Sequence, residues 1–419
     1  MKILILNSGS FPYPSANGCS VQIYSIIEAF IRHDNEVILY NFNTKFEDID
    51  PKIAINNLEK KGVKCYLEKE IFSTLQPSNW KQQFTYFLKD ATYEFYNGLF
   101  HQKSVDKLIS IEAPNLIFGY TLNAALSFNF DQHQIPFVLS IVDIDSLVIK
   151  FRFKYSNHKS FISKFFAYLR YKRSRNLDKL LINIIQKSLL CFEHAHHHKI
   201  YLEKLGANNV IYYPVNVLGL QNNVPYFNKK SDKINLALIG NVNGIATLSG
   251  LVDFIDNYLP YIAKDRVLSK CFVFNIYGGG IIQSPYLEKL KSFDLVNLIG
   301  FVEDVQTIYA DNEIIFVPTN IPLGFRTRIV ESFSYGKCVL THLNNAIAFP
   351  EFEHNINGLY YDNVAKFLEV LNEIVHDKSI IERISKNARD LFLNSINGEI
   401  IGERMYNDIL KALDNKKEI

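Results

Sequence analysis

The sequence predicts an α/β protein made of two doubly wound domains, each with a parallel sheet covered by helices on both faces. Short apolar runs alternate with helix-like segments from the first residues on, which is typical of parallel sheets. A polar, aperiodic segment interrupts this pattern near the middle of the chain, and a second alternating set follows it. At 419 residues the chain is also longer than one hydrophobic core usually supports.

The elements of the first domain follow from the spacing of apolar residues. Residues 3–6 form an apolar run typical of a buried strand, and residues 21–31 have the periodicity of a helix. This start is too short for a signal peptide, so we interpret it as a strand. Further strands are predicted at residues 37–40, 115–118, 137–142, 189–192 and 210–213.

The second half repeats the pattern after a break. Its first strand is predicted at residues 234–239, and another apolar run at 314–318 ends in a proline, as a buried parallel strand does. Between the halves the chain gains Asn, Lys and Pro and loses periodicity, which indicates a linker. The predicted division is a first Rossmann-like domain at residues 1–215, a linker at 216–232, a second Rossmann-like domain at 233–398 and a C-terminal helix at 399–419.

Composition excludes several classes of protein. A hydrophobic content of 48% with 21% charged residues indicates a globular chain, and a net charge of +2 predicts no global attraction to nucleic acid. The five cysteines form no Cys-x-x-Cys pair, which favours a reducing compartment and argues against structural zinc. No apolar run reaches the roughly 18 residues needed to span a bilayer. We therefore expect a cytoplasmic protein.

The stretch after the strand at 314–318 is the most informative in the chain. Gly324 is followed by Arg326, Arg328 and a predicted helix that carries Glu331. Free N–H groups at a helix start, its positive dipole end and two guanidinium groups would together bind a phosphate. Glu331 would lie near enough to accept hydrogen bonds from a sugar or ribose hydroxyl. Taken alone, the same residues could equally be a solvated helix start.

The surrounding motifs carry a resemblance to a known family. They stand in order along the chain as Tyr-Gly-Gly-Gly at 277–280, Gly-Phe-Val-Glu-Asp at 300–304, Pro318, Glu331 and Asn-Gly-Leu at 357–359. This order resembles that of the retaining glycosyltransferase family four (glycosyl transferases group 1), which has the GT-B fold of two Rossmann-like domains facing across a crevice. The resemblance implies a nucleoside-diphosphate sugar as donor, no metal, and a C-terminal helix that crosses back to the first domain.

The resemblance also assigns roles to residues. Arg326 and Arg328 would stabilise the leaving diphosphate, and we expect Arg326, nearer the Gly324 turn, to contribute more. Asp143, on the acceptor side, would orient an acceptor hydroxyl or act as a base. The residues implied in donor binding are Gly18, Gly240, Asn241, Gly278, Gly279, Phe301, Val302, Gly324, Phe325, Thr327 and Glu331.

One position departs from the family pattern. Leu323 stands where most members have a glutamate that contacts the donor sugar, so the identity of the sugar stays open. Arg326 and Arg328 instead fit an Arg-and-Lys branch of the family. Two alternatives to a transferase therefore remain, a GT-B nucleotide-sugar epimerase and a non-catalytic GT-B partner subunit.

Two motifs suggest metal ligands, and we disfavour a metal at both. Asp143 and Asp145 are separated by one residue but lie in the acceptor half, and the alternative is that they cap the following helix. His194 and His198 have the i, i+4 spacing of helical metal ligands, yet no third ligand stands out. We expect this histidine cluster to precede a helix at residues 199–205.

Residues 150–175 form the other unusual segment. They contain nine Lys or Arg and no acid, interleaved with Phe and Tyr. This pattern suits the interface of an anionic membrane, or a core helix with a basic outer face. Binding of nucleic acid is disfavoured by the overall charge. We expect a glycosyltransferase, peripheral on the inner face of the cell membrane, that extends a lipid-linked glycan in capsule or lipopolysaccharide synthesis.

Overall fold

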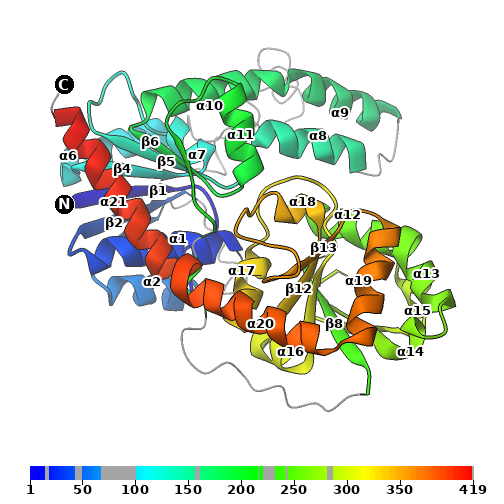
Figure 1. Ribbon diagram of the computed structural model, residues 1–419. Helices are drawn as coiled ribbons and strands as arrows, with labels where there is room; N and C mark the ends of the chain where they lie inside the picture. The colour runs from blue at the N-terminus through cyan, green and yellow to red at the C-terminus, as the bar shows by residue number, and fades with distance from the viewer. Residues whose placement is uncertain are drawn as a thin grey trace. The chain divides into compact units, whose positions relative to one another are not determined.

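The computed structural model describes residues 1–14, 18–42, 50–67, 101–155, 161–215, 217–219, 232–241, 244–280 and 286–417. The chain divides into two compact units, each an α/β fold with a parallel sheet (Figure 1). The predicted fold class is thereby confirmed. Unit 1 comprises Met1–Leu218 and Gly398–Ile419, and unit 2 comprises Gly219–Asn397.

Unit 1 is built on a seven-stranded parallel sheet with the order β3-β2-β1-β4-β5-β6-β7. Every strand from β1 to β7 pairs in parallel with its neighbours, as near-continuous apolar runs require. Strand order reverses between β1 and β4, which makes this the switch point of a Rossmann-like fold. The strands are β1 (Lys2–Asn7), β2 (Glu36–Asn41), β3 (Lys64–Leu67), β4 (Leu116–Tyr120), β5 (Phe137–Ile141), β6 (Leu190–Glu193) and β7 (Val210–Tyr212).

Helices cover both faces of the unit 1 sheet. One apolar cluster joins the sheet to α1, α2 and α21, and a second joins its other face to α6, α7, α10 and α11. Their bounds are α1 (Gly18–Arg32), α2 (Pro51–Glu59), α6 (Gln102–Glu112), α7 (Leu122–Leu126), α8 (Asp145–Tyr155), α9 (Phe161–Arg173), α10 (Arg175–Lys187), α11 (His196–Lys204) and α21 (Gly398–Lys417).

The C-terminal helix α21 packs on α1 within unit 1. The rings of His33 and Tyr406 stack with centroids 4.0 Å apart, and Asn35 donates to the Tyr406 hydroxyl at 3.2 Å. Ile401 and Ile409 are fully buried in the same apolar cluster. The last helix therefore completes the fold of the first unit, although unit 2 precedes it in the chain.

Unit 2 has a six-stranded parallel sheet with the order β10-β9-β8-β11-β12-β13. Its order reverses between β8 and β11, so this unit has the Rossmann-like switch point as well. The strands are β8 (Ile234–Ile239), β9 (Phe272–Tyr277), β10 (Val296–Gly300), β11 (Ile314–Val317), β12 (Cys338–His342) and β13 (Leu359–Tyr361).

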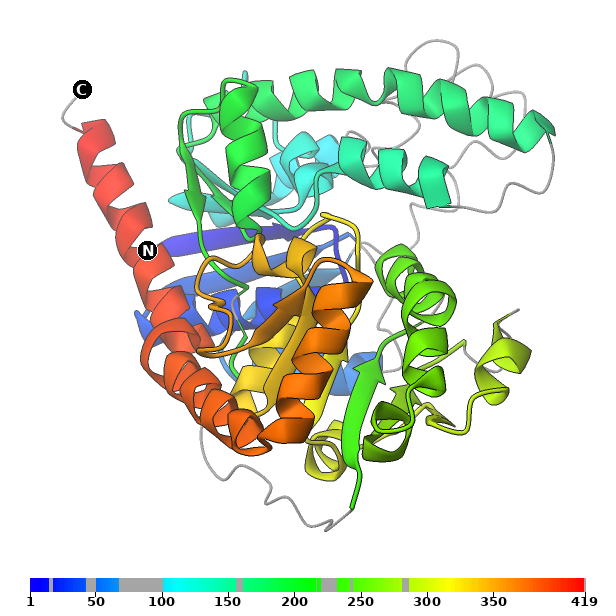
Figure 2. The ribbon, with the colours of Figure 1, turned by 45° about the vertical axis from the view of Figure 1, so that its right-hand side comes forward.

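The helices of unit 2 alternate with these strands, and π-helical turns continue two of them. Figure 2 shows α12, α13 and α19 beside the sheet. The bounds are α12 (Ile245–Asp253), η2 (Phe254–Tyr258), α13 (Leu259–Lys264), α14 (Leu268–Cys271), α15 (Leu287–Lys291), α16 (Val305–Asp311), α17 (Thr327–Ser334), α18 (Leu343–Ala346), α19 (Val364–His376), α20 (Ser379–Leu391) and η3 (Phe392–Ile396).

Two local expectations need correction. The helix expected at residues 199–205 begins at His196, because its first turn is made of histidines, which carry no apolar periodicity. The Glu193 carboxylate fixes the chain just before this helix by accepting the N–H groups of His194 and Ala195. The core-helix interpretation of residues 150–175 is wrong for α9, none of whose side chains is buried. Within the residues that the structure describes, no helix is both long enough and apolar enough to cross a membrane.

Candidate active site

The carboxyl ends of β8 and β11 form the natural ligand site of unit 2, because open α/β sheets bind ligands where the strand order reverses. The chain leaves β8 into α12 and β11 into α17, so two helix N-termini lie at this edge. Their first N–H groups have no partner within the helix and carry partial positive charge. The edge is therefore suited to an anion.

Two glycines bring the strand ends together without side chains between them. Gly240 donates its N–H to the Tyr277 carbonyl at 2.9 Å, and Gly278 donates to the Gly300 carbonyl at 2.7 Å. Their φ angles are +154° and +125°, which residues with a Cβ rarely adopt. A Cβ on Gly278 would lie 2.1 Å from the Gly240 carbonyl oxygen. Only glycine fits there.

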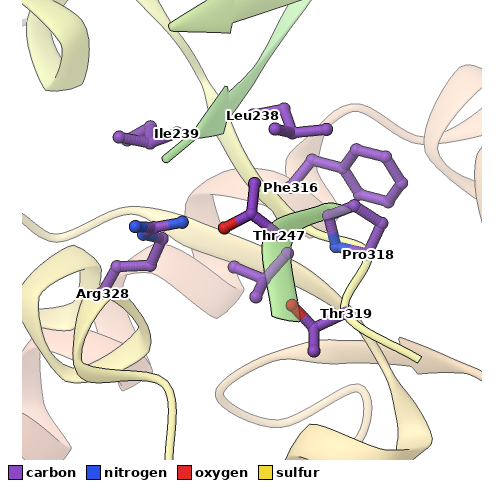
Figure 3. Close-up of a pocket in the computed structure, with 8 residues that line it drawn as sticks. Leu238, Ile239, Thr247, Phe316, Pro318, Thr319 and Arg328 are labelled. Carbon is purple, nitrogen blue, oxygen red and sulfur yellow. The ribbon is translucent and has the colours of Figure 1, made fainter. Parts of the chain in front are cut away.

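Arg328 lies against this bare backbone. A Cβ on Gly240 would come within 2.6 Å of the Arg328 Nη1 and 2.8 Å of the Thr247 Oγ1. Figure 3 shows the Arg328 guanidinium and the Thr247 hydroxyl pointing toward one another across a small cavity, which Pro318 and Thr319 close on the other side. The cavity has a volume of about 10 Å³, room for about one water molecule. A fixed cation thus stands between the starts of α12 and α17.

Glu331 and Tyr309 lie close enough to Arg328 to interact with its charge. Burial raises the pKa of Glu331, and the positive charge of Arg328 opposes this shift. Burial also lowers the pKa of Arg328, which Tyr309 and Glu331 counteract, and an arginine stays charged under such conditions. The Tyr309 ring stacks on Tyr335 with centroids 4.0 Å apart. Glu331 is therefore a partly buried acceptor next to a cation, as a hydroxyl-binding residue needs to be.

The loop between β11 and α17 is fixed by amide side chains. Asn345 donates to the carbonyl groups of Val317 at 3.3 Å and Thr319 at 2.9 Å. Leu323 is buried, and the Arg326 guanidinium donates to its carbonyl oxygen. Arg326 thus contacts its own loop, whereas Arg328 contacts the glycine backbone. The geometry therefore favours Arg328 as the main charge partner, the reverse of the order expected from the sequence.

Other predicted donor residues line the same edge of the sheet. Gly279 has the Asn241 side-chain nitrogen as its nearest neighbour, 4.0 Å from the place of a Cβ. Phe301 follows β10 and is 73% exposed, and Val302 beside it is partly buried. An exposed aromatic ring at this position is available to a ligand.

The remaining predicted donor residues belong to the start of α17. Gly324 has a φ of +61°, which turns the chain toward the helix. Thr327 is the first residue of α17. The Phe325 ring packs against Phe349, with centroids 5.1 Å apart, so it supports the loop.

In unit 1 the structure brings Gly18 and Asp143 to the same sheet edge. Gly18 begins α1, and the next residue, Cys19, accepts a long hydrogen bond of 3.4 Å from the Tyr120 hydroxyl through its carbonyl. The same hydroxyl donates to Gln22 at 2.8 Å. Burial raises the pKa of Tyr120, with Cys19 and the nearby Asp143 adding to the shift. This edge includes the switch point of unit 1, where the strand order reverses between β1 and β4.

A strained threonine at this edge was not predicted. Thr121 has a φ of +83°, an unfavourable angle for a β-branched residue. Its N–H donates to the Ser140 carbonyl at 2.9 Å, and its hydroxyl lies 2.5 Å from that of Ser8. Strain of this kind persists only where surrounding contacts hold it, and it marks the β1–β4 switch point as a candidate site.

The histidine cluster is held within unit 1 by protein contacts. His194 lies 3.0 Å from the Ser140 hydroxyl and 3.1 Å from the Tyr213 carbonyl, and burial lowers its pKa to about 4. His198 lies 3.5 Å from the Glu193 carboxylate, whose pKa burial raises. In the described part of the chain, no group of three or more His, Cys, Asp or Glu residues could hold a metal ion.

Part of the chain matches a known protein family. Residues 233–377 match the family model described as Glycosyl transferases group 1. No curated protein matches the chain. The predicted class of enzyme, a glycosyltransferase, is confirmed by this family match.

Solved glycosyltransferase structures share the fold over nearly the whole chain. Anabaena HepE in complex with UDP-glucose aligns with a TM-score of 0.62 and 14% identity, over 98% of this chain and 100% of its own. Sucrose-phosphate synthase from Thermosynechococcus elongatus gives 0.67 and 13%, over 98% and 99%. WaaG, a glycosyltransferase involved in lipopolysaccharide biosynthesis, gives 0.61 and 13%, over 98% and 99%. At such identities the likeness shows the fold, which is that of the GT-B glycosyltransferases.

Proposed function

We propose that the protein transfers a sugar from a nucleoside-diphosphate sugar to a hydroxyl group of a growing glycan. The observation that carries the proposal is the Arg328 guanidinium, which lies against the bare backbone of Gly240 between the starts of α12 and α17. A diphosphate is the anion that such a site fits best, because it accepts both from helix N–H groups and from a guanidinium.

The mechanism follows from the charges at this edge. As the bond between the sugar and the diphosphate breaks, negative charge grows on the leaving group, and Arg328 with the two helix starts stabilises it. Glu331 accepts hydrogen bonds from a hydroxyl of the ribose or the sugar. The acceptor hydroxyl passes its proton to the leaving phosphate, and the configuration at the anomeric carbon is retained, as the family resemblance implies. Asp143 in unit 1 orients the acceptor.

The acceptor we propose is a lipid-linked glycan at the inner face of the cell membrane. A role in surface polysaccharide synthesis, of capsule or lipopolysaccharide, is supported by the likeness to WaaG. HepE was solved with UDP and with UDP-glucose, so uridine nucleotides are the first donors to test.

A thermal-shift screen against UDP-, GDP-, ADP- and dTDP-sugars tests the proposal, because a ligand that binds the folded state raises apparent stability. Calorimetry then gives the affinity, and analysis of the products gives the reaction. Transfer with retained configuration supports the transferase. An epimerised or hydrolysed sugar without transfer indicates the epimerase alternative. A folded protein that binds none of these nucleotides indicates a non-catalytic partner subunit, which the buried Leu323 would explain.

We further propose that transfer needs no metal ion, because Arg328 and two helix starts already supply positive charge at the diphosphate. Turnover should be the same in EDTA as in magnesium or manganese. Activity that EDTA abolishes and manganese restores would contradict this and make Asp143 and Asp145 candidate ligands.

A further inference from the structure

Helix α9 exposes most of its large apolar side chains. Phe161 is 84% exposed, Ile162 67% and Phe165 49%, and Phe166 and Tyr168 are exposed as well. No side chain of the helix is buried. A surface helix of a globular protein normally buries a stripe of apolar side chains, whereas α9 leaves its apolar side chains exposed to solvent.

The helix is nevertheless well supported at its base. Ser174, between α9 and α10, keeps helical dihedral angles of −58° and −22°, and α9 continues α10 as one rod in both views (Figures 1 and 2). Helix α10 is anchored in the unit 1 core by Leu177 and Leu181, among others. The Phe153 ring of α8 stacks on Tyr171 with centroids 5.5 Å apart. The exposed apolar side chains of α9 thus belong to a helix that is anchored in unit 1.

Basic side chains accompany the exposed rings. Lys164, Arg170, Lys172 and Arg173 belong to α9, and no acid occurs between residues 150 and 175. Lys172 Nζ lies 5.5 Å from the centroid of the Tyr168 ring. Residues 150–175 hold nine Lys or Arg in a chain whose net charge is +2, so positive charge is concentrated in one segment of the sequence.

We propose that α9 is a membrane-docking helix for an anionic bilayer. Its rings and Ile162 enter the boundary between headgroups and acyl chains, while the four basic side chains lie among phosphate headgroups. A second copy of the chain is a poorer occupant, because two such faces would bring like charges together. A nucleic acid would leave Phe161 and Ile162, the most exposed apolar side chains, without partners.

The test uses the full-length protein and two kinds of vesicle, pure phosphatidylcholine and phosphatidylcholine mixed with phosphatidylglycerol. Cosedimentation with the anionic vesicles is expected at about 50 mM salt and should fall at least tenfold at about 0.5 M, where the Debye length is short. Far less protein should cosediment with vesicles of pure phosphatidylcholine.

Three variants separate charge, apolar contact and general electrostatics. The charge variant replaces Lys164, Arg170, Lys172 and Arg173 with Gln and should lose at least tenfold in vesicle binding at low salt. The apolar variant, Phe161→Ser with Phe165→Ser, should lose binding even at low salt. The matched control removes the same number of charges elsewhere in unit 1. It replaces Lys52 of α2, Lys60 directly after α2, and Lys103 and Lys107 of α6 with Gln, and should bind as the wild type does.

Docking and nucleotide binding can fail separately. Each variant should keep wild-type affinity for the nucleotide-sugar in solution, because the altered residues lie in unit 1 and the donor site in unit 2. A wild type that stays in solution with anionic vesicles at low salt overturns the docking proposal. So does a control variant that loses as much binding as the charge variant, or an apolar variant that only converts a dimer into a monomer.

Discussion

At the scale of single residues, Arg328 is the side chain on which the proposed chemistry depends. Its guanidinium contacts the strand-end backbone, whereas that of Arg326 donates to the Leu323 carbonyl. We expect Arg328→Ala to lower kcat/KM by about 10- to 150-fold, as for the loss of hydrogen bonds to a charged group worth about 1.5–3 kcal/mol. Arg326→Ala should have a smaller effect. Steady-state kinetics of both variants measure this, with melting temperatures as a control for folding. A larger loss for Arg326→Ala would restore the order expected from the sequence.

Glu331 should make donor binding depend on pH. Burial raises the pKa of Glu331, and the positive charge of Arg328 offsets only part of this shift. The carboxyl therefore takes up a proton at a higher pH than an exposed glutamate does. Affinity for the donor nucleotide-sugar should be full at about pH 8 and fall on acidification toward about pH 5, nearer the ordinary range of a glutamate.

Two variants control the pH experiment, which calorimetry can follow. Glu331→Gln cannot titrate, so its affinity should change little across the same range. Glu331→Ala should weaken binding at pH 8 by about 1.5–3 kcal/mol. Unchanged affinity in a folded Glu331→Ala variant would remove this residue from the site.

The residues of the site were only partly predictable. Arg328, Glu331, Gly240 and Gly278 stand in recognisable motifs, and the structure brings all four to one sheet edge. Thr247 was missed, since a threonine in a first helical turn carries no sign of which strand end it faces. The buried contacts of Tyr309, the strain at Thr121 and the loop contact of Arg326 depend on tertiary packing, which sequence spacing does not contain.

At the scale of elements, the two strand-end glycines make the clearest prediction. Gly278→Ala places a methyl group 2.1 Å from the Gly240 carbonyl oxygen at a φ of +125°. Such a strained position costs of the order of 1–3 kcal/mol even without the clash. We expect a lower melting temperature and weaker nucleotide binding.

The neighbouring Gly279→Ala is the matched control for this experiment. A methyl group there would meet nothing nearer than the Asn241 side chain at 4.0 Å. Its melting temperature should stay close to that of the wild type. Equal destabilisation by both substitutions would mean that loss of backbone flexibility, and not the close approach of two strand ends, is what matters.

The alternation of strands and helices was predictable because buried parallel strands are apolar on both faces and therefore easy to recognise. The runs at residues 3–6 and 234–239 lie in β1 and β8, and the run at 314–318 contains β11, with Pro318 directly after it; these three strands line the switch points. Strand β3 was missed, since Lys64–Leu67 is short and only partly buried. The start of α11 was placed too late because the three histidines at its beginning carry no apolar periodicity that would mark a helix.

At the scale of the whole molecule, the chain leaves unit 1, forms unit 2 and ends on unit 1 again. Residues near the C-terminus therefore stabilise the unit that begins at the N-terminus. The sequence predicted a helix at the C-terminus. Which of its side chains pack against α1 depends on tertiary structure and could not be predicted. Ile409, Tyr406 and Ile401 supply that face.

Because the C-terminal helix belongs to unit 1, a substitution close to the C-terminus should destabilise unit 1 and leave donor binding intact. Ile409 is fully buried in unit 1, so Ile409→Ala should destabilise that unit by about 2–5 kcal/mol, the usual cost of such a cavity. Hydrogen exchange measured by mass spectrometry should show faster exchange in β1 and β4 than in the wild type, with β8 and β11 unchanged.

The exposed Lys411 on the same helix gives the control, because Lys411→Ala removes no core contact. Affinity for the nucleotide-sugar should be equal in all three proteins. Faster exchange in β8 and β11 instead would mean that α21 stabilises unit 2, and the division of the chain into these two units would be wrong.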